Sequence, residues 1–174
     1  VSRGLGDVYK RQEGGRFLPG GTMTRGMLVT VLYRLAGEPS VQGLENPFYD
    51  VSLNRYYGAP VLWASANGLV EGHGNGKFTP EGNVTRQDMA VILYRYAQQM
   101  GYDTTPVGDL TAFPDADRVS GYAADPMRWA VGNGIIHGVK NGQTNTLSPR
   151  AYSTRAQVAV VLQRFVEKIV EDPV

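Results

Sequence analysis

The chain repeats the pattern of Pro80-Glu81-Gly82-Asn83-Val84-Thr85-Arg86 at two other places, which makes this segment the strongest indication of the fold. The matching stretches are Pro19-Gly20-Gly21-Thr22-Met23-Thr24-Arg25 and Pro149-Arg150-Ala151-Tyr152-Ser153-Thr154-Arg155. In each copy the last threonine stands five residues after the proline, and a second arginine stands ten residues after that threonine. Fixed spacing in three copies indicates one structural unit that is built three times.

An amphipathic helix is predicted after each copy of this stretch. Apolar residues recur at helical spacing after Thr24, Thr85 and Thr154, and the first of these helices is expected over residues 24–35. Threonine is a favoured N-cap, and Asp88 and Gln157 stand where a capping box needs an acid or amide. Three helices with one apolar face each cannot bury those faces alone. The repeats therefore predict a mainly α fold, with pseudo-threefold symmetry, a central three-helix bundle and flanking prong helices.

Two of the copies also have an earlier helix, which carries the tryptophans of the chain. These helices are predicted over residues 57–67 and 121–133, with Trp63 and Trp129 at matching places. A glycine follows each tryptophan by five residues, where a left-handed C-terminal cap is expected; these are Gly68 and Gly134. The loop that comes next is three residues longer in the last copy, and such a difference belongs in a surface loop.

The repeats divide the chain into four parts. Residues 47–98 and 112–168 are complete copies, residues 14–36 correspond to the second half of a copy, and residues 1–12 match none of them. Residues 1–12 resemble translated sequencing adapter, so we expect them to be an artefact and the chain to be a truncated piece. Without them three basic residues and one acidic residue are lost, and the formal net charge changes from +1 to −1. Neither value of the net charge favours nucleic acid as a partner, and the sequence has no cluster of Lys and Arg that would bind it.

Several kinds of site are excluded by the residues present. The chain has no Cys, which excludes disulfides and thiolate chemistry, and no apolar run approaches the roughly 18 residues of a membrane span. The Gly-rich segment from Gly72 to Gly76 lacks the Lys and Ser/Thr of a phosphate-binding loop. His73 and His137 occupy different places in their copies, and no paired carboxylates recur. We therefore expect no metal site, no cofactor and no catalysis.

Taken together, the repeated positions resemble the S-layer homology domain. The shared frame is Phe-x-Asp, Trp-Ala, Asn-Gly, Phe-x-Pro and Thr-Arg, and it extends from Gly14 to about Lys168. The acidic fourth position of the family's Thr-Arg-Ala-Glu motif is kept only as Asp88. The resemblance implies a module at one end of an exported protein. Such a module would tether that protein to a secondary polysaccharide of the bacterial cell wall, attached to peptidoglycan and often pyruvylated.

Arginine is the first candidate for glycan binding. Arg25, Arg86 and Arg155 are predicted at the first turns of their helices, where free backbone N–H groups and the guanidinium together suit a carboxylate or phosphate. In the alternative interpretation, each arginine donates to a nearby loop carbonyl or to an aspartate of the same repeat. The family resemblance favours ligand contact for at least one of them.

Two further pairs of residues are candidates for sugar contact. Trp63 and Trp129 have faces that could stack on a sugar ring, and core packing is the alternative. Asp50 and Asp115 could accept hydrogen bonds from sugar hydroxyls, or they could cap the turn that follows them.

The sequence therefore predicts a non-catalytic anchoring module on the outer surface of a bacterial cell, which binds an acidic wall polysaccharide. Repetition would place several weak sites on one anchor. The alternative function is a protein-interaction module for self-assembly of a surface lattice. An enzyme is expected only in a missing upstream passenger, which could be a hydrolase.

Overall fold

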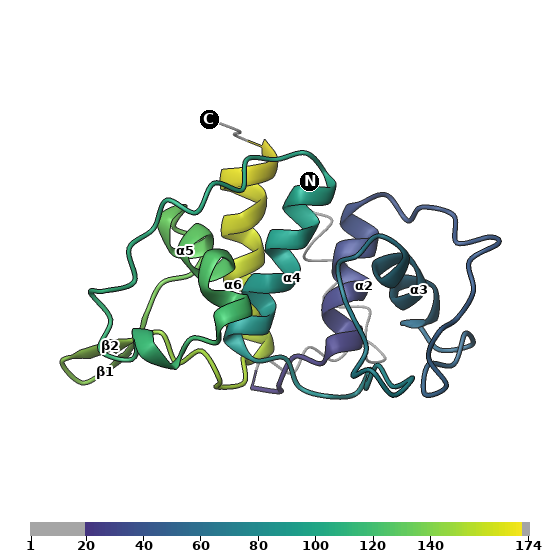
Figure 1. The fold of residues 1–174 in the computed structure, drawn as a ribbon, viewed down its shortest axis with the longest axis horizontal. Helices are drawn as coiled ribbons and strands as arrows, with labels where there is room; N and C mark the ends of the chain where they lie inside the picture. Colours follow the sequence, from purple (N-terminus) through teal and green to yellow (C-terminus); the bar gives the residue numbers. More distant parts are fainter. Residues whose placement is uncertain (1–19, 172–174) are drawn as a thin grey trace. The chain divides into compact units, whose positions relative to one another are not determined.

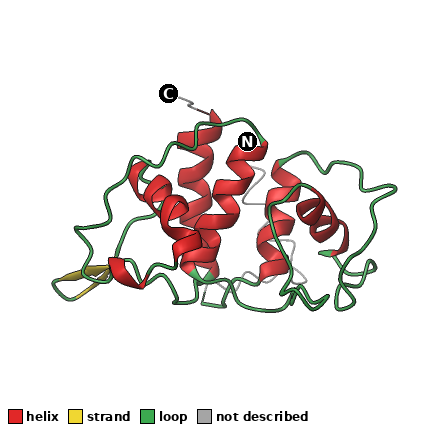
Figure 2. Cartoon of the chain, viewed as in Figure 1, coloured by secondary structure: helices red, strands yellow, loops and turns green. Residues whose placement is uncertain are grey.

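The computed structural model describes residues 20–171. They fall into two compact units, the first ending at Asn83 and the second beginning at Val84. Residues 1–12 and the start of the partial repeat, residues 14–19, lie outside the described part. Helices dominate both units, and the small sheet has two strands (Figure 2). The mainly α fold is confirmed, whereas the threefold arrangement of a central bundle stays a prediction.

Unit 1 is built on two helices, α2 (Arg25–Leu35) and α3 (Gly58–Ala66), which lie side by side (Figure 1). The Tyr33 ring of α2 contacts Trp63 of α3, with the ring centroids 5.6 Å apart. Long loops supply the rest of the core, including Leu69 and Phe78, which are fully buried. The unit therefore joins the second helix of repeat 1 to the first helix and loops of repeat 2.

Unit 2 has the same pair of packed helices as unit 1, together with further helices and a small sheet. Its helices are α4 (Arg86–Gln99), the 3-10 turns η1 (Ala116–Arg118) and η2 (Gly121–Ala123), α5 (Ala124–Gly132), α6 (Arg155–Phe165) and the terminal π-helical segment η3 (Val166–Glu171). The Tyr94 ring of α4 contacts Trp129 of α5 at 5.6 Å, as Tyr33 contacts Trp63 in unit 1. Phe165 of α6 also contacts Trp129, at 6.3 Å.

The extra residues in the loop of repeat 3 form a short hairpin. Strands β1 (Val139–Asn141) and β2 (Thr144–Thr146) pair antiparallel, with Val139 opposite Thr146. Gly142 at the turn has a φ of 65°, which glycine adopts without steric cost. The sequence predicted a longer surface loop here but not its strand pairing.

The ends of the helices follow the predicted signals. Thr24, Thr85 and Thr154 are the N-caps, and each side chain accepts a hydrogen bond from the third backbone N–H of its helix. Gly68 and Gly134 follow α3 and α5 with positive φ angles of 72° and 67°. The reciprocal capping box forms at Thr154 with Gln157. It is incomplete at Thr85, because the Asp88 carboxylate accepts a hydrogen bond from Tyr122 instead.

Candidate functional site

Arg25, the first residue of α2, is bound by the loop of the following repeat. Its Nε donates to the Phe78 carbonyl at 3.0 Å, and its Nη2 donates to the Glu71 carbonyl at 3.1 Å. The guanidinium also lies 4.5 Å from the centroid of the Phe78 ring, which is within the range of a cation–π contact. These contacts fix Arg25 of repeat 1 against repeat 2.

Arg86, the first residue of α4, makes the corresponding two carbonyl contacts in unit 2. Its Nε donates to the Leu147 carbonyl at 2.8 Å, and its Nη2 donates to the His137 carbonyl at 2.9 Å. The residue is only 5 % exposed, and this burial lowers the pKa of Arg86, against an opposing effect of Asp115. In both units the arginine bonds loop carbonyls, as the alternative interpretation of the sequence expected.

The backbone N–H groups at the start of α2 and α4 are also bonded. Arg25 and Gly26 donate to the carbonyls of Gly82 and Pro80, both at 2.8 Å. In α4, the first two N–H groups donate to Ala151 and Pro149 at 3.0 and 2.9 Å. Since the threonine cap takes the third N–H, these two helix ends do not offer the open anion site that the sequence predicted there.

Asp50 and Asp115 hold the loops that receive these arginines. Asp50 accepts from the N–H groups of Phe78 and Thr79, each at 2.8 Å. Asp115 accepts from Leu147 and Ser148, again at 2.8 Å. The two aspartates thus hold a loop about thirty residues further along the chain rather than the turn directly after them. Hydrogen bonds from sugar hydroxyls to these aspartates stay a prediction.

The loops are held in a conformation that their residues disfavour. Thr79 and Ser148 have φ angles of 59° and 47°, in the left-handed region that costs non-glycine residues energy. Each stands directly before the proline of the repeated stretch, and each donates its N–H to the aspartate. We call the aspartate, this loop and the arginine the loop clamp. It comprises Asp50, Phe78–Pro80 and Arg25 in unit 1, and Asp115, Leu147–Pro149 and Arg86 in unit 2.

The loop clamp also sets the charge state of Asp50. Burial raises the pKa of this carboxyl, but the hydrogen bonds from Phe78 and Thr79, with a smaller effect of Lys77, outweigh it and leave the pKa below its usual range. The carboxylate is therefore stabilised in its charged form by the loop that it organises.

Both tryptophans lie in the core. Trp63 is 4 % exposed and Trp129 is 0 % exposed, and the indole N–H of Trp129 donates to the Asp103 carbonyl at 3.1 Å. Each ring contacts the tyrosine of the preceding repeat's helix. In this conformation neither indole presents a face to solvent, and stacking on a sugar stays a prediction. Arg155 begins α6 and is partly buried, and its contact with a ligand likewise stays a prediction.

Sequence reasoning missed a pair of tyrosines beside the helix ends. Tyr122 is 60 % exposed, and its hydroxyl donates to Asp88 at 2.7 Å and accepts from Gln87 at 3.2 Å. Tyr56 is 38 % exposed and forms a hydrogen bond with Thr24. The signal was present, because each of these tyrosines stands seven residues before a tryptophan. Their exposed rings, held by the hydroxyl, suit stacking on a flat apolar group.

Unit 2 also has an open cleft of about 950 Å³ beside its loop clamp. It is lined by Asp115, Asp117, Arg118, Thr146, Ser148 and Arg150, together with neighbouring apolar atoms. Within residues 20–171, no three His, Asp or Glu side chains gather as metal ligands would. In the same residues we find no helix with the length and hydropathy needed to cross a bilayer.

The sequence matches the family model described as "S-layer homology domain" over residues 47–90 and 112–159. A surface-layer 125 kDa protein of Lysinibacillus sphaericus is 33% identical over 167 residues, which are 95% of this chain and 14% of that protein. A cellulosome-anchoring protein of Acetivibrio thermocellus is 31% identical over 58% of the chain and 22% of its own length. An amylopullulanase of Thermoanaerobacterium thermosulfurigenes is 27% identical over 88% of the chain and 8% of its length. The chain therefore spans less than a quarter of each of these relatives.

Proposed function

Because the chain belongs to the S-layer homology domain family, we propose that it anchors a longer protein to the bacterial cell wall by binding an acidic secondary polysaccharide. It is a cell-surface module. Its relatives include proteins with surface-layer, anchoring and glycanase names, and they share with it a segment that is small compared with their own length. One segment common to proteins of such different names supports a tethering role better than a catalytic one.

The observation that carries this proposal is the junction between successive repeats, which recurs in both units. In each, the second helix of one repeat is held against the first half of the next by the loop clamp and by a Tyr–Trp contact. Beside each junction an exposed tyrosine is held by its hydroxyl. A rigid junction with an exposed aromatic ring is pre-organised for a sugar, since little freedom remains to be lost on binding.

The seven residues predicted from the sequence divide into two roles in this proposal. Arg25, Arg86, Asp50 and Asp115 build the junction through the loop clamp, and their loops present polar groups to the glycan. Direct contact with the glycan is proposed for Arg155. Trp63 and Trp129 would reach it only if the junction opened.

Cosedimentation with cell-wall sacculi tests the anchoring function. We expect the 174-residue chain to pellet with sacculi of a Gram-positive bacterium that carry their secondary polysaccharide, and to stay in solution when that polysaccharide has been removed by acid. Equal pelleting in both cases would reject the polysaccharide as the ligand. A chain that sediments without sacculi would favour the alternative, which is self-assembly of a surface lattice.

Arg86→Ala separates a structural role from direct ligand contact. The loop clamp predicts a loss of about 2–4 kcal/mol in unfolding free energy, because the Leu147 and His137 carbonyls lose their donor in a buried place. Urea unfolding and wall binding should be measured on the same variant. Full stability with weakened binding would show instead that Arg86 contacts the glycan.

A further inference from the structure

We propose that the cleft of unit 2 is an anion site, in which Arg118 and Arg150 together bind the carboxylate or phosphate of a sugar residue. The proposal rests on the anchoring function and names the residues that bind the charged group of the glycan. It assigns the binding of the anion in unit 2 to two arginines outside the repeated Thr-Arg pair, beside the glycan contact proposed for Arg155.

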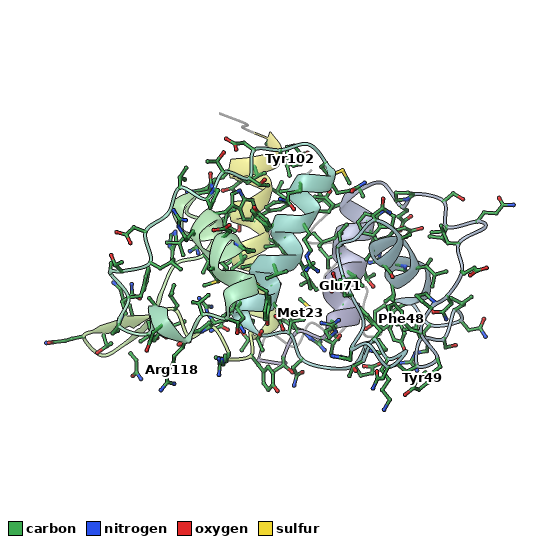
Figure 3. All side chains as sticks on the ribbon, in the orientation of Figure 1. Met23, Phe48, Tyr49, Glu71, Tyr102 and Arg118 are labelled. Atoms are coloured by element: carbon green, nitrogen blue, oxygen red, sulfur yellow. The ribbon has the colours of Figure 1, made fainter. Side chains whose placement is uncertain are left out.

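Arg118 and Arg150 come from different segments and reach one cleft. Arg118 ends the η1 turn, and Arg150 follows the proline of the repeated stretch. Both are exposed and both line the cleft of about 950 Å³. Figure 3 shows Arg118 beside the η1 turn, away from the long helices α4 and α6. Two guanidinium groups that line one cleft can bind one anion with several charge-assisted hydrogen bonds.

Neither guanidinium is used by the fold. Among residues 20–171, no hydrogen bond or ion pair engages the side chain of Arg118 or Arg150. Arg25 and Arg86, by contrast, donate to loop carbonyls. An arginine that already bonds two carbonyls has fewer donors left for a ligand, whereas these two retain all of theirs.

The cleft also contains groups that suit a sugar rather than a bare ion. Asp117 is exposed and lines the cleft, as do Thr146 and Ser148, whose hydroxyl oxygens lie 2.8 Å apart. Both oxygens of Asp115 already accept backbone N–H groups of the loop, so this carboxylate has less capacity left for sugar hydroxyls. The Asp117 carboxylate can therefore accept hydrogen bonds from sugar hydroxyls, while the guanidinium groups of Arg118 and Arg150 donate to the anion.

Unit 1 lacks this pair of charges. Glu81 stands where Arg150 stands in repeat 3, and its carboxylate lies 3.2 Å from Arg55 in an exposed ion pair. The counterpart of Arg118 is Ser52 if residues are counted back from the tryptophan, and Leu53 if they are counted on from the aspartate. The two junctions are thus alike in their loop clamps and different in charge, so the anion site belongs to unit 2 alone.

The direct test follows the Arg Nε–H signals of the 174-residue chain by NMR. Glucuronic acid, glucose 1-phosphate and neutral glucose are titrated separately. We expect the Arg118 and Arg150 signals to shift with at least one charged sugar and not with glucose, and the sugar that shifts them identifies a carboxylate or phosphate. Absence of any shift with both charged sugars would overturn the proposal.

A variant pair tests the same site on the wall. Arg118→Ala with Arg150→Ala should weaken binding to intact sacculi about tenfold at low salt, since two charge-assisted contacts are lost. The matched control, Arg55→Ala with Lys140→Ala, removes two exposed cations outside the cleft and should bind like the parent chain. Equal binding by both double variants rejects the anion site and leaves the anchoring function standing. No binding by the parent chain rejects the anchoring function itself.

Discussion

At the scale of single residues, side chains that looked like ligand contacts form the loop clamp. The sequence placed Arg25 and Arg86 at helix starts, and Asp50 and Asp115 at repeat openings. It could not show that the arginines bond carbonyls of the next repeat, because any residue type can supply a backbone carbonyl. The left-handed backbone conformation of Thr79 and Ser148 could not be predicted either, since neither threonine nor serine favours that conformation.

Removing Asp115 should loosen the loop that it holds. In Asp115→Ala, the N–H groups of Leu147 and Ser148 lose their acceptor, and we expect the unfolding free energy to fall by about 1–3 kcal/mol. Asp117→Ala is the matched control, because Asp117 is exposed and should change stability by less than about 0.5 kcal/mol. Urea unfolding of both variants checks this, and equal losses would contradict the loop clamp.

Asp50 should make stability depend on pH in the acid range. Its pKa is lower in the folded chain than in the unfolded chain, so the folded state binds fewer protons there. This stabilisation is complete above the unfolded pKa of about 4 and is lost as the pH falls through the folded value. Unfolding free energies measured across this range should fall more steeply for the parent chain than for Asp50→Asn. Identical slopes would refute this contribution.

At the scale of helices and strands, sequence patterns were most reliable where a side chain itself marks the boundary. The three threonine caps and the two glycines after the tryptophans were predicted correctly. The helix predicted over residues 121–133 instead begins as the η2 turn, and α5 starts at Ala124. The hairpin of repeat 3 was missed because strand pairing depends on backbone partners across a turn, and its strands have only three residues each.

Gly132 of α5 packs closely against Gly108, in the segment before the helix. A Cβ at Gly132 would lie 2.6 Å from the Gly108 backbone nitrogen, so Gly132→Ala must push the linker away. We expect a loss of about 1–3 kcal/mol in unfolding free energy. Gly121→Ala is the control, since a Cβ there meets no atom within 4 Å. Thermal unfolding compares the two variants, and an unaffected Gly132→Ala would refute this contact.

At the scale of the whole molecule, the structural units are offset from the sequence repeats. Unit 1 joins the end of repeat 1 to the first part of repeat 2, and unit 2 joins the end of repeat 2 to the whole of repeat 3, so the boundary between the units falls inside a repeat. The sequence predicted a shared helical core from three amphipathic helices, and it correctly predicted a mainly α fold. The sequence could not predict that the junction between two repeats is the structural feature that recurs. That feature depends on which loop carbonyls each arginine bonds, and the sequence does not show this.

We propose that this chain binds an acidic wall polysaccharide through the negative charge of the polymer. Calorimetric titration of the chain with polysaccharide released from Gram-positive walls tests it most directly, in parallel with the same polymer after its acidic groups have been neutralised chemically. We expect saturable binding to the native polymer and little or none to the neutralised one. Equal affinity for both polymers, or none for either, would contradict it.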